Sequence, residues 1–164
     1  MDLEGFAEVL LSCAPFAPGE TFIDLGSGTG KAVLCAAALA PFKRATGVEF
    51  VRPLHDAAQR LADAAAPLLA KLGGGAAAEV RMKLGDALDE DLSRVGVVFA
   101  ATTCWSDDAL ARLTTACARA KKGARLINMT RRLALPAADW ELLRKVRAQY
   151  GRGRMTFFVY RKKT

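Results

Sequence analysis

Short runs suited to strands alternate along this chain with longer amphipathic or alanine-rich stretches suited to helices. Strand and helix that alternate in this way predict a doubly wound α/β fold with a mostly parallel sheet. The predicted strands cover residues 21–25, 45–50, 79–84, 95–100 and 124–129, and the predicted helices cover residues 6–11, 31–39, 53–72 and 107–120.

Residues with strong positional preferences set the expected ends of these helices. Pro53 suits the first turn of the long helix, and the glycines and alanines of 73–78 predict its end and a loop. Ser106 is the expected N-cap of the 107–120 helix, and Gly123 is its expected stop.

The C-terminal part departs from the alternation. Residues 140–148 show no clear period, whereas 155–160 are strongly strand-like. Gly151 and Gly153 between them predict a hairpin, so we expect two antiparallel strands after the parallel ones.

The composition fits one domain over residues 1–164, since 52% of the 164 residues are hydrophobic and no apolar run approaches about 20 residues. The start Met1-Asp2-Leu3-Glu4 lacks the features of a signal peptide, so we expect an intracellular protein, cytoplasmic or nuclear. The four cysteines are widely spaced and His55 is the single histidine, which predicts reduced thiols and no metal site.

The net charge of +7 is unevenly distributed. Residues 1–90 contain 8 Lys/Arg and 12 Asp/Glu (net −4), whereas residues 91–164 contain 16 Lys/Arg and 5 Asp/Glu (net +11). The basic C-terminal half is suited to weak contact with nucleic acid, nucleosomes or an acidic protein face. Solvated helix faces and sheet edges would account for the same cations.

A glycine-rich segment follows the first predicted strand: Asp24, Leu25, Gly26, Ser27, Gly28, Thr29 and Gly30. Ligands of open α/β sheets bind beyond the carboxyl ends of the strands, where this loop is expected. Its glycines permit tight turns and close approach of a ligand, and the helix from Lys31 offers free N–H groups to a ligand carboxylate. A phosphate-binding P-loop is excluded because Ala32 follows Gly30-Lys31.

Three acids stand at or near the ends of three successive strands. Asp24 is suited to accept a hydrogen bond from the loop or from an ammonium group. Glu49 is suited to accept hydrogen bonds from ribose hydroxyls, and Asp86 from an adenine amino group. With their neighbours Phe50 and Ala87, they complete the expected cofactor-binding set.

Phe22 to Leu34, together with Gly47-Val48-Glu49, resembles the cofactor core of class I methyltransferases that use S-adenosylmethionine (SAM). Within this class, the chain resembles the disruptor-of-telomeric-silencing type of histone-lysine methyltransferase and its small relatives. Val97 to Asp107, with Thr102-Thr103-Cys104-Trp105, is similar to their segment beside the methyl-transfer site. The resemblance implies a seven-stranded sheet with a C-terminal antiparallel hairpin, SAM as cofactor, and methylation of a protein lysine such as one on a histone.

On the acceptor side, the resemblance implies roles for Thr102, Thr103, Cys104 and Trp105. Ala101 departs from the family, which has asparagine there, and few residues precede the first strand. Two alternatives therefore stay open: a non-catalytic SAM-binding module with a basic partner-binding face, and an RNA or small-molecule methyltransferase on the same fold. The Asn/Asp-Pro-Pro-aromatic motif of nucleic-acid amino-group methylation is absent from the sequence.

Overall fold

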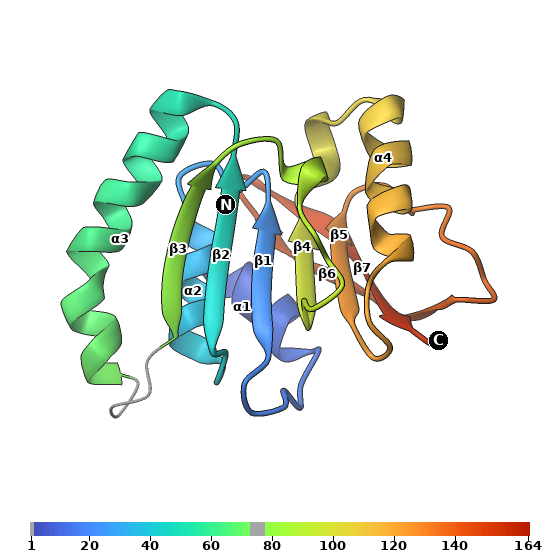
Figure 1. Ribbon diagram of the computed structural model, residues 1–164, viewed down its shortest axis with the longest axis horizontal. Coiled ribbons are helices and arrows are strands. Elements are labelled where there is room, and N and C mark those ends of the chain that lie inside the picture. The colour runs from blue at the N-terminus through green and yellow to red at the C-terminus, as the bar shows by residue number, and fades with distance from the viewer. Residues whose placement is uncertain (1, 73–77) are drawn as a thin grey trace.

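The computed structural model describes residues 2–72 and 78–164. The predicted loop over 73–78 therefore lies almost entirely outside the described residues. Within them, one seven-stranded sheet has the order β3-β2-β1-β4-β5-β7-β6. The first five strands are parallel, and β7 is antiparallel to both β5 and β6, which confirms the predicted fold class (Figure 1).

The strands of the parallel part lie close to their predicted positions: β1 Thr21–Leu25, β2 Arg44–Glu49, β3 Glu79–Leu84, β4 Val97–Ala100 and β5 Arg125–Met129. β4 is two residues shorter than predicted, because Val95 and Gly96 form a turn whose N–H groups bond to Leu92 and Thr21. Phe50, predicted as the last residue of the second strand, lies beyond the end of β2.

The helices are α1 Leu3–Leu11, α2 Lys31–Leu39, α3 Arg52–Leu72 and α4 Asp107–Ala118, with short 3₁₀ turns η1 Ala87–Asp89 and η2 Thr102–Cys104. The first helix begins three residues earlier than predicted, because the Asp2 carboxylate accepts a hydrogen bond from Gly5 N at 3.0 Å and caps it. Ser106 caps α4 as predicted. None of the described helices is long and apolar enough to cross a membrane.

The C-terminal hairpin is longer than its sequence pattern indicates. β6 spans Trp140–Tyr150, although residues 140–148 show no clear period, and β7 spans Gly153–Lys162. The prediction failed for β6 because the register shifts between Leu142 and Arg144, and an extra residue there moves the following side chains to the opposite faces.

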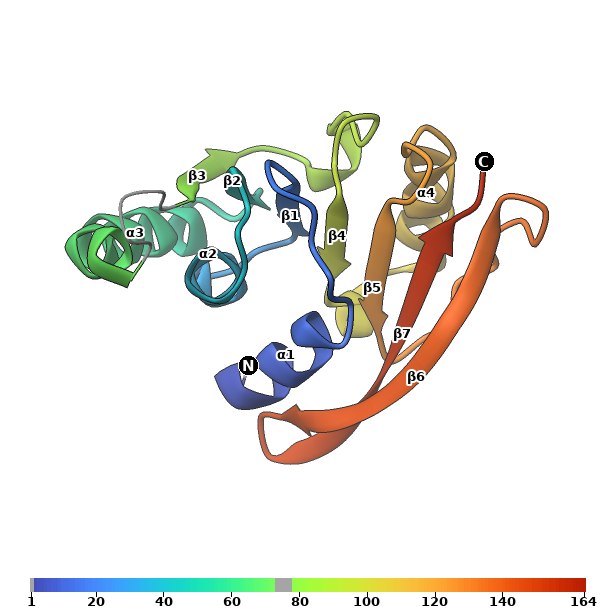
Figure 2. The same cartoon turned by 90° about the horizontal axis from the view of Figure 1, so that it is seen from below.

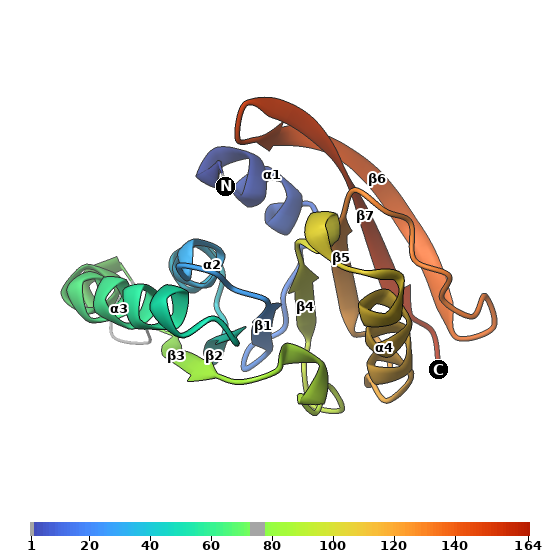
Figure 3. The same ribbon diagram turned by 90° about the horizontal axis from the view of Figure 1, so that it is seen from above.

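The helices divide between the two faces of the sheet. Figure 2 shows α1 and α2 on one face and α4 on the other. α1 lies between the parallel strands and the curved hairpin, so the hairpin wraps around it (Figure 3).

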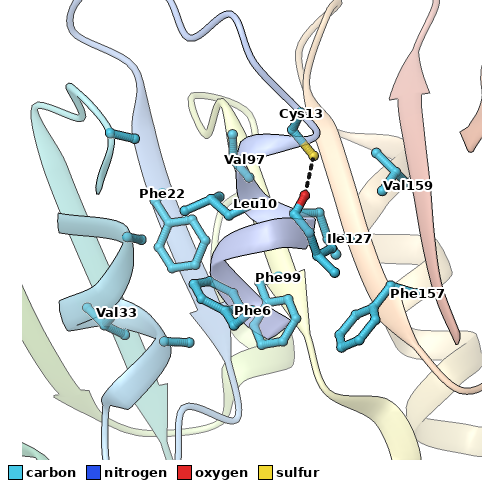
Figure 4. Close-up of a cluster of buried hydrophobic side chains, with 14 of the residues drawn as sticks. Phe6, Leu10, Cys13, Phe22, Val33, Val97, Phe99, Ile127, Phe157 and Val159 are labelled. Carbon is cyan, nitrogen blue, oxygen red and sulfur yellow. Dashed lines mark hydrogen bonds between the residues drawn. The ribbon is translucent and has the colours of Figure 1, made fainter. Parts of the chain in front are cut away.

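Aromatic side chains from distant segments hold α1 in this position. Phe6 of α1 is fully buried, with its ring centroid 4.9 Å from that of Phe99 on β4 and 6.2 Å from that of Phe22 on β1 (Figure 4). Phe157 of β7 belongs to the same buried cluster. The core on this side therefore joins α1, the parallel strands and the hairpin.

Candidate functional site

The predicted cofactor loop lies at the carboxyl edge of the sheet, where the arrowheads of β1 and β2 end in Figure 1. The loop is tied to the neighbouring strand, because the N–H groups of Gly26 and Ser27 both donate to the Val48 carbonyl, at 2.9 and 3.0 Å. Its backbone needs glycine, since φ is +78° at Gly26, +54° at Gly28 and +78° at Gly30.

Two glycines allow the loop to pack closely on the sheet and on α3. A Cβ at Gly47 of β2 would lie 2.7 Å from Ser27 Oγ and 2.9 Å from a methyl group of Val33. A Cβ at Gly30 would lie 2.7 Å from the methyl group of Met82. A Cβ at Gly28, by contrast, would meet no described atom within 4 Å, so this position faces open space.

Glu49 ends β2 and is nearly buried, with 5% of its surface exposed. One carboxylate oxygen accepts a hydrogen bond from Gly28 N at 2.8 Å, and the other accepts from Val51 N at 2.9 Å. Each oxygen keeps a lone pair for a further donor. Glu49 therefore fixes the loop and can still accept hydrogen bonds from a ligand.

Asp24 is the least exposed acid of the site, at 3%. Among the described residues, its Oδ1 atom has no hydrogen-bond partner. Burial and the nearby charge of Glu49 raise the pKa of Asp24 to about 8. The predicted hydrogen bond from the loop to this oxygen is thus not made within residues 2–72 and 78–164, and the buried carboxyl keeps an acceptor that this part of the chain does not satisfy.

A pocket opens between this loop and the C-terminal hairpin. Residues from β1, its loop, the start of α2, β4 and the end of β6 line it: Asp24, Gly26, Ser27, Gly28, Thr29, Lys31, Ala32, Phe99, Ala101 and Tyr150. The structure therefore brings together five of the predicted loop residues. It adds Phe99, Ala101 and Tyr150 to the lining.

Tyr150 is the residue of this pocket that the sequence analysis missed, because it lies 120 residues after Gly30 and no motif surrounds it. The half-buried side chain packs edge-on against Phe157, with ring centroids 6.0 Å apart. Desolvation, with Asp24 and Cys104 nearby, raises the pKa of Tyr150, so the phenol is neutral at physiological pH.

α1 fixes the position of Tyr150 through its neighbour Gln149. An added Cβ at Gly5 would lie 1.9 Å from the Gln149 carbonyl oxygen, so α1 touches the backbone of β6 directly. Glycine is unfavourable inside a helix, and this contact is the reason for it here. Gly5 is the sequence signal that could have indicated a close backbone approach, although not to which segment.

The predicted acceptor segment forms η2 beside this pocket. Thr102 is fully buried and donates to the Met129 carbonyl at 2.8 Å, so it has a structural role. Thr103 and Cys104 are exposed, and Trp105 is half-buried. The Trp105 indole lies over Gly26, where an added Cβ would be 3.5 Å from the ring. The Trp105 side chain therefore lies close to Gly26 of the glycine-rich loop.

Residues at the end of β5, which no sequence motif indicates, hold η2 in place. The fully buried Asn128 donates from Nδ2 to Thr102 Oγ1 at 3.3 Å and to the Arg131 carbonyl at 2.5 Å. Thr130 has φ +77°, which is strained for a β-branched residue, and its hydroxyl lies 3.0 Å from that of Thr103. Strain of this kind is concentrated at functional sites.

The remaining predicted residues lie on the side of the loop toward β3. Phe50 follows Glu49 and is 74% exposed, whereas Ala87 is buried. Asp86 caps η1 by accepting from Leu88 N at 2.9 Å and pairs with Arg112 of α4 at 2.8 Å. These bonds lower the pKa of Asp86, so it is a carboxylate at neutral pH. Asp86 is therefore already bonded within the chain, unlike Asp24.

These features fit a cofactor with a cationic end and a ribose. Asp24, which has a buried oxygen without a partner in the described residues, lines the pocket, the Gly28 position leaves space that a side chain would fill, and the Glu49 carboxylate bonds to the loop. No group of three or more His, Cys, Asp or Glu residues suited to hold a metal ion occurs in 2–72 and 78–164.

Comparison with solved structures gives the same fold. An RNA methyltransferase from Salinibacter ruber, solved with S-adenosyl-L-homocysteine, is 20% identical (TM-score 0.66), covering 95% of this chain and 88% of that one. TrmN from Thermus thermophilus is 24% identical (TM-score 0.69), and the match covers 95% of this chain and 48% of that one. Geranyl diphosphate C-methyltransferase from Streptomyces coelicolor is 23% identical (TM-score 0.59), and the match covers 76% of this chain and 44% of that one. These likenesses establish a class I methyltransferase fold.

A search of curated proteins gives no match. A family model does match: "Histone methylation protein DOT1", over residues 3–138. The matched range runs from α1 to the end of the loop after β5, so it contains the glycine-rich loop, Glu49 and the acceptor segment, and it ends before the hairpin that supplies Tyr150. The chain has the class I methyltransferase fold, and its cofactor is S-adenosylmethionine. It therefore belongs to the family of the histone methylation protein DOT1.

Proposed function

We propose that this chain transfers the methyl group of SAM to the side-chain amine of a lysine in a protein. The observation that carries the proposal is that three uncharged residues, Phe99, Ala101 and Tyr150, line the pocket together with the glycine-rich loop, and that Ala101 directly precedes η2. Such a surface suits the alkyl chain of a lysine, and the family match supports a protein acceptor.

The residues for the cofactor are assigned from their geometry. In this proposal Asp24 would accept a hydrogen bond from the ammonium of the methionyl end, Glu49 would accept from the ribose hydroxyls, and Phe50 would cover the adenine with its exposed ring. Asp86 and Ala87 would bound the adenine on its other side. The N-terminus of α2 directs free N–H groups toward the methionyl carboxylate. When bound, SAM supplies an electrophilic methyl group on a positively charged sulfur.

Positioning accounts for the rest of the chemistry. The lysine must arrive as a neutral amine, its proton released to water, because η2 contains no acid and no histidine to act as a base. The hydrogen bonds from Asn128 and Thr102 hold η2, and Trp105 forms a wall beside the loop. An acceptor held in line at about 3–3.5 Å from the methyl group gains most of its rate from this orientation.

The acceptor can be tested with SAM labelled in its methyl group. Incubation with nucleosomes, free histones, total cell protein, total RNA and small-molecule extracts is followed by hydrolysis and amino-acid analysis. Labelled methyl-lysine from the protein fractions supports the proposal. Label in RNA or small molecules, or SAM binding without transfer to any fraction, supports one of the two alternatives and contradicts lysine methylation.

We also propose that the basic C-terminal half contributes to partner binding. Residues 91–164 contain 16 Lys/Arg and 5 Asp/Glu. A field of this sign attracts polyanions such as nucleosomal DNA or RNA, and salt weakens the attraction. Binding of a DNA duplex that is tight in 50 mM salt and lost in 200 mM salt would support this contact.

A further inference from the structure

β6 forms a free edge of the sheet. The strand order ends with β6, which in the described part of the chain pairs with β7 alone. Two carbonyls near the end of β6 are already engaged, since Arg154 Nη2 donates to the Arg147 carbonyl at 2.6 Å and the Gln149 carbonyl lies against Gly5 of α1. The other backbone N–H and C=O groups on this side have no partner strand among the described residues and can accept one. Eleven residues make β6 long for an edge strand, which ordinarily invites pairing with other chains.

Exposed cations cover one face of this edge. Beyond the register shift at Leu142/Arg144 the ladder is regular, so Lys145 and Arg147 project from the same face. Arg154 of β7 stands opposite Gln149 and projects from that face as well. Two residues along a strand span about 7 Å, so the cations repeat at the spacing of alternate side chains in an extended peptide.

These cations differ from the exposed cations near the other end of the sheet. Arg44 and Arg81 both pair with Glu79, and Lys83 pairs with Glu90. Among residues 2–72 and 78–164, no carboxylate lies within 4.0 Å of the side-chain nitrogens of Lys145, Arg147 or Arg154. The hairpin therefore carries positive charge that the chain itself does not neutralise.

Hydrogen bonds connect the hairpin to the acceptor segment. Thr156, which stands opposite Arg147, accepts a hydrogen bond at its carbonyl from Thr130 N at 2.9 Å. The Thr130 hydroxyl in turn lies 3.0 Å from that of Thr103 in η2. At its end, β6 places Tyr150 in the cofactor pocket. A strand added along β6 would thus approach the site of methyl transfer.

We infer that the free edge of β6 binds an extended, acid-rich segment of the substrate protein, with alternate Asp or Glu side chains on Lys145, Arg147 and Arg154. The inference rests on the proposed protein-lysine function and names the context of the lysine. Main-chain hydrogen bonds would supply affinity, and the charge pattern would supply selectivity. The same cations oppose pairing with a second copy of β6, because like charges would face each other.

The test uses fluorescent peptides that contain one lysine and differ in their flanks: alternating Asp/Glu, alternating Gln/Ser, or alternating Lys/Arg. Anisotropy measures binding to the full chain in the presence of S-adenosylhomocysteine, and labelled SAM measures transfer. We expect the acidic peptide to bind about tenfold more tightly than the neutral one, and the difference to shrink with salt. Backbone N-methylation at alternate positions of the acidic peptide should remove its binding, because strand addition needs those N–H groups.

The variant Lys145→Glu/Arg147→Glu should lose the preference for the acidic peptide, whereas Lys121→Glu/Lys122→Glu, with the same charge change in the turn before β5, should keep it. The inference is overturned by equal binding of all three peptides, by acidic-peptide binding that survives N-methylation, or by RNA that binds the same edge in place of the peptide. Binding as expected without methylation of any lysine would leave the edge assigned and contradict the proposed function instead.

Discussion

The two walls of the pocket beside the glycine-rich loop are built in different ways. The glycine-rich wall is local: its bends need glycine, and it bonds to the adjacent strand through Val48 and Glu49. The hairpin wall is assembled from distant segments, since Tyr150 takes its place from the contact of Gly5 with Gln149 and from packing on Phe157. Substitutions in the first wall should therefore change ligand binding directly, and those in the second should act through packing.

The largest expected effect comes from filling the space at Gly28. Gly28→Val should abolish SAM binding, because the added side chain enters the pocket and φ is +54° there. Gly123→Val is the matched control, with φ +79°, no described atom near its Cβ and no place in the pocket. Calorimetric titration with SAM should show no heat of binding for the first variant and normal binding for the control. Normal binding by Gly28→Val would contradict the loop assignment.

Glu49 should have the next largest effect. Glu49→Ala removes acceptors for the ligand and leaves Gly28 N and Val51 N without their partners, so SAM binding should weaken by about 1–3 kcal/mol. Glu49→Gln keeps one acceptor oxygen and should fall between this variant and the wild type. The same titration measures both, and equal affinities for Ala and wild type would exclude Glu49 from the ribose site.

The pKa of Asp24, about 8, predicts a pH dependence of both binding and stability. The ionised carboxylate favours the ammonium of SAM, but that α-amino group itself loses its proton at about pH 8, so affinity should rise about threefold from pH 7 to pH 8 and fall again toward pH 9. Between pH 7 and pH 8, the free energy of unfolding should change in the opposite direction. The folded state holds the Asp24 proton more tightly than the unfolded chain does, so the protonated carboxyl stabilises the fold fully below about pH 4, and this stabilisation is lost as pH rises through 8.

Asp24→Asn separates these two effects. The amide cannot ionise, so both the rise in affinity and the fall in the free energy of unfolding over this pH range should be reduced. Titrations of SAM and urea denaturation at pH 6, 7, 8 and 9 check this. A wild type whose SAM affinity is constant over this range would show that Asp24 does not bind the cationic end.

The smallest effect tests the second wall. Gly5→Ala gains about 1 kcal/mol of helix propensity but forces a methyl group against the Gln149 carbonyl, so we expect a net loss of about 1–2 kcal/mol in unfolding free energy. SAM affinity should fall with it, to the level of Tyr150→Ala, because both changes disturb the same end of the pocket. Gly85→Ala is the control, since an added Cβ there meets no described atom within 4 Å. Unchanged SAM affinity in Gly5→Ala would show that α1 does not position Tyr150.

The sequence by itself determined the parallel half of the fold and the cofactor loop. Strands and caps there follow from nearby residues, and the positive φ angles of Gly26, Gly28 and Gly30 agree with the turn that their spacing predicts. The position of Glu49 beside this loop was predictable for the same reason, because the carboxyl ends of neighbouring parallel strands meet at one edge.

The tertiary structure alone decided the rest. The register shift interrupts the alternation of side chains in β6, so the sequence pattern did not predict this strand. Tyr150 reaches the pocket because α1 and the hairpin pack together. Asp24 differs from Asp86 through burial and lack of a partner, although both were predicted from similar positions after strands. Contacts between residues far apart in the chain, and the desolvation that packing imposes, leave no local pattern in the sequence.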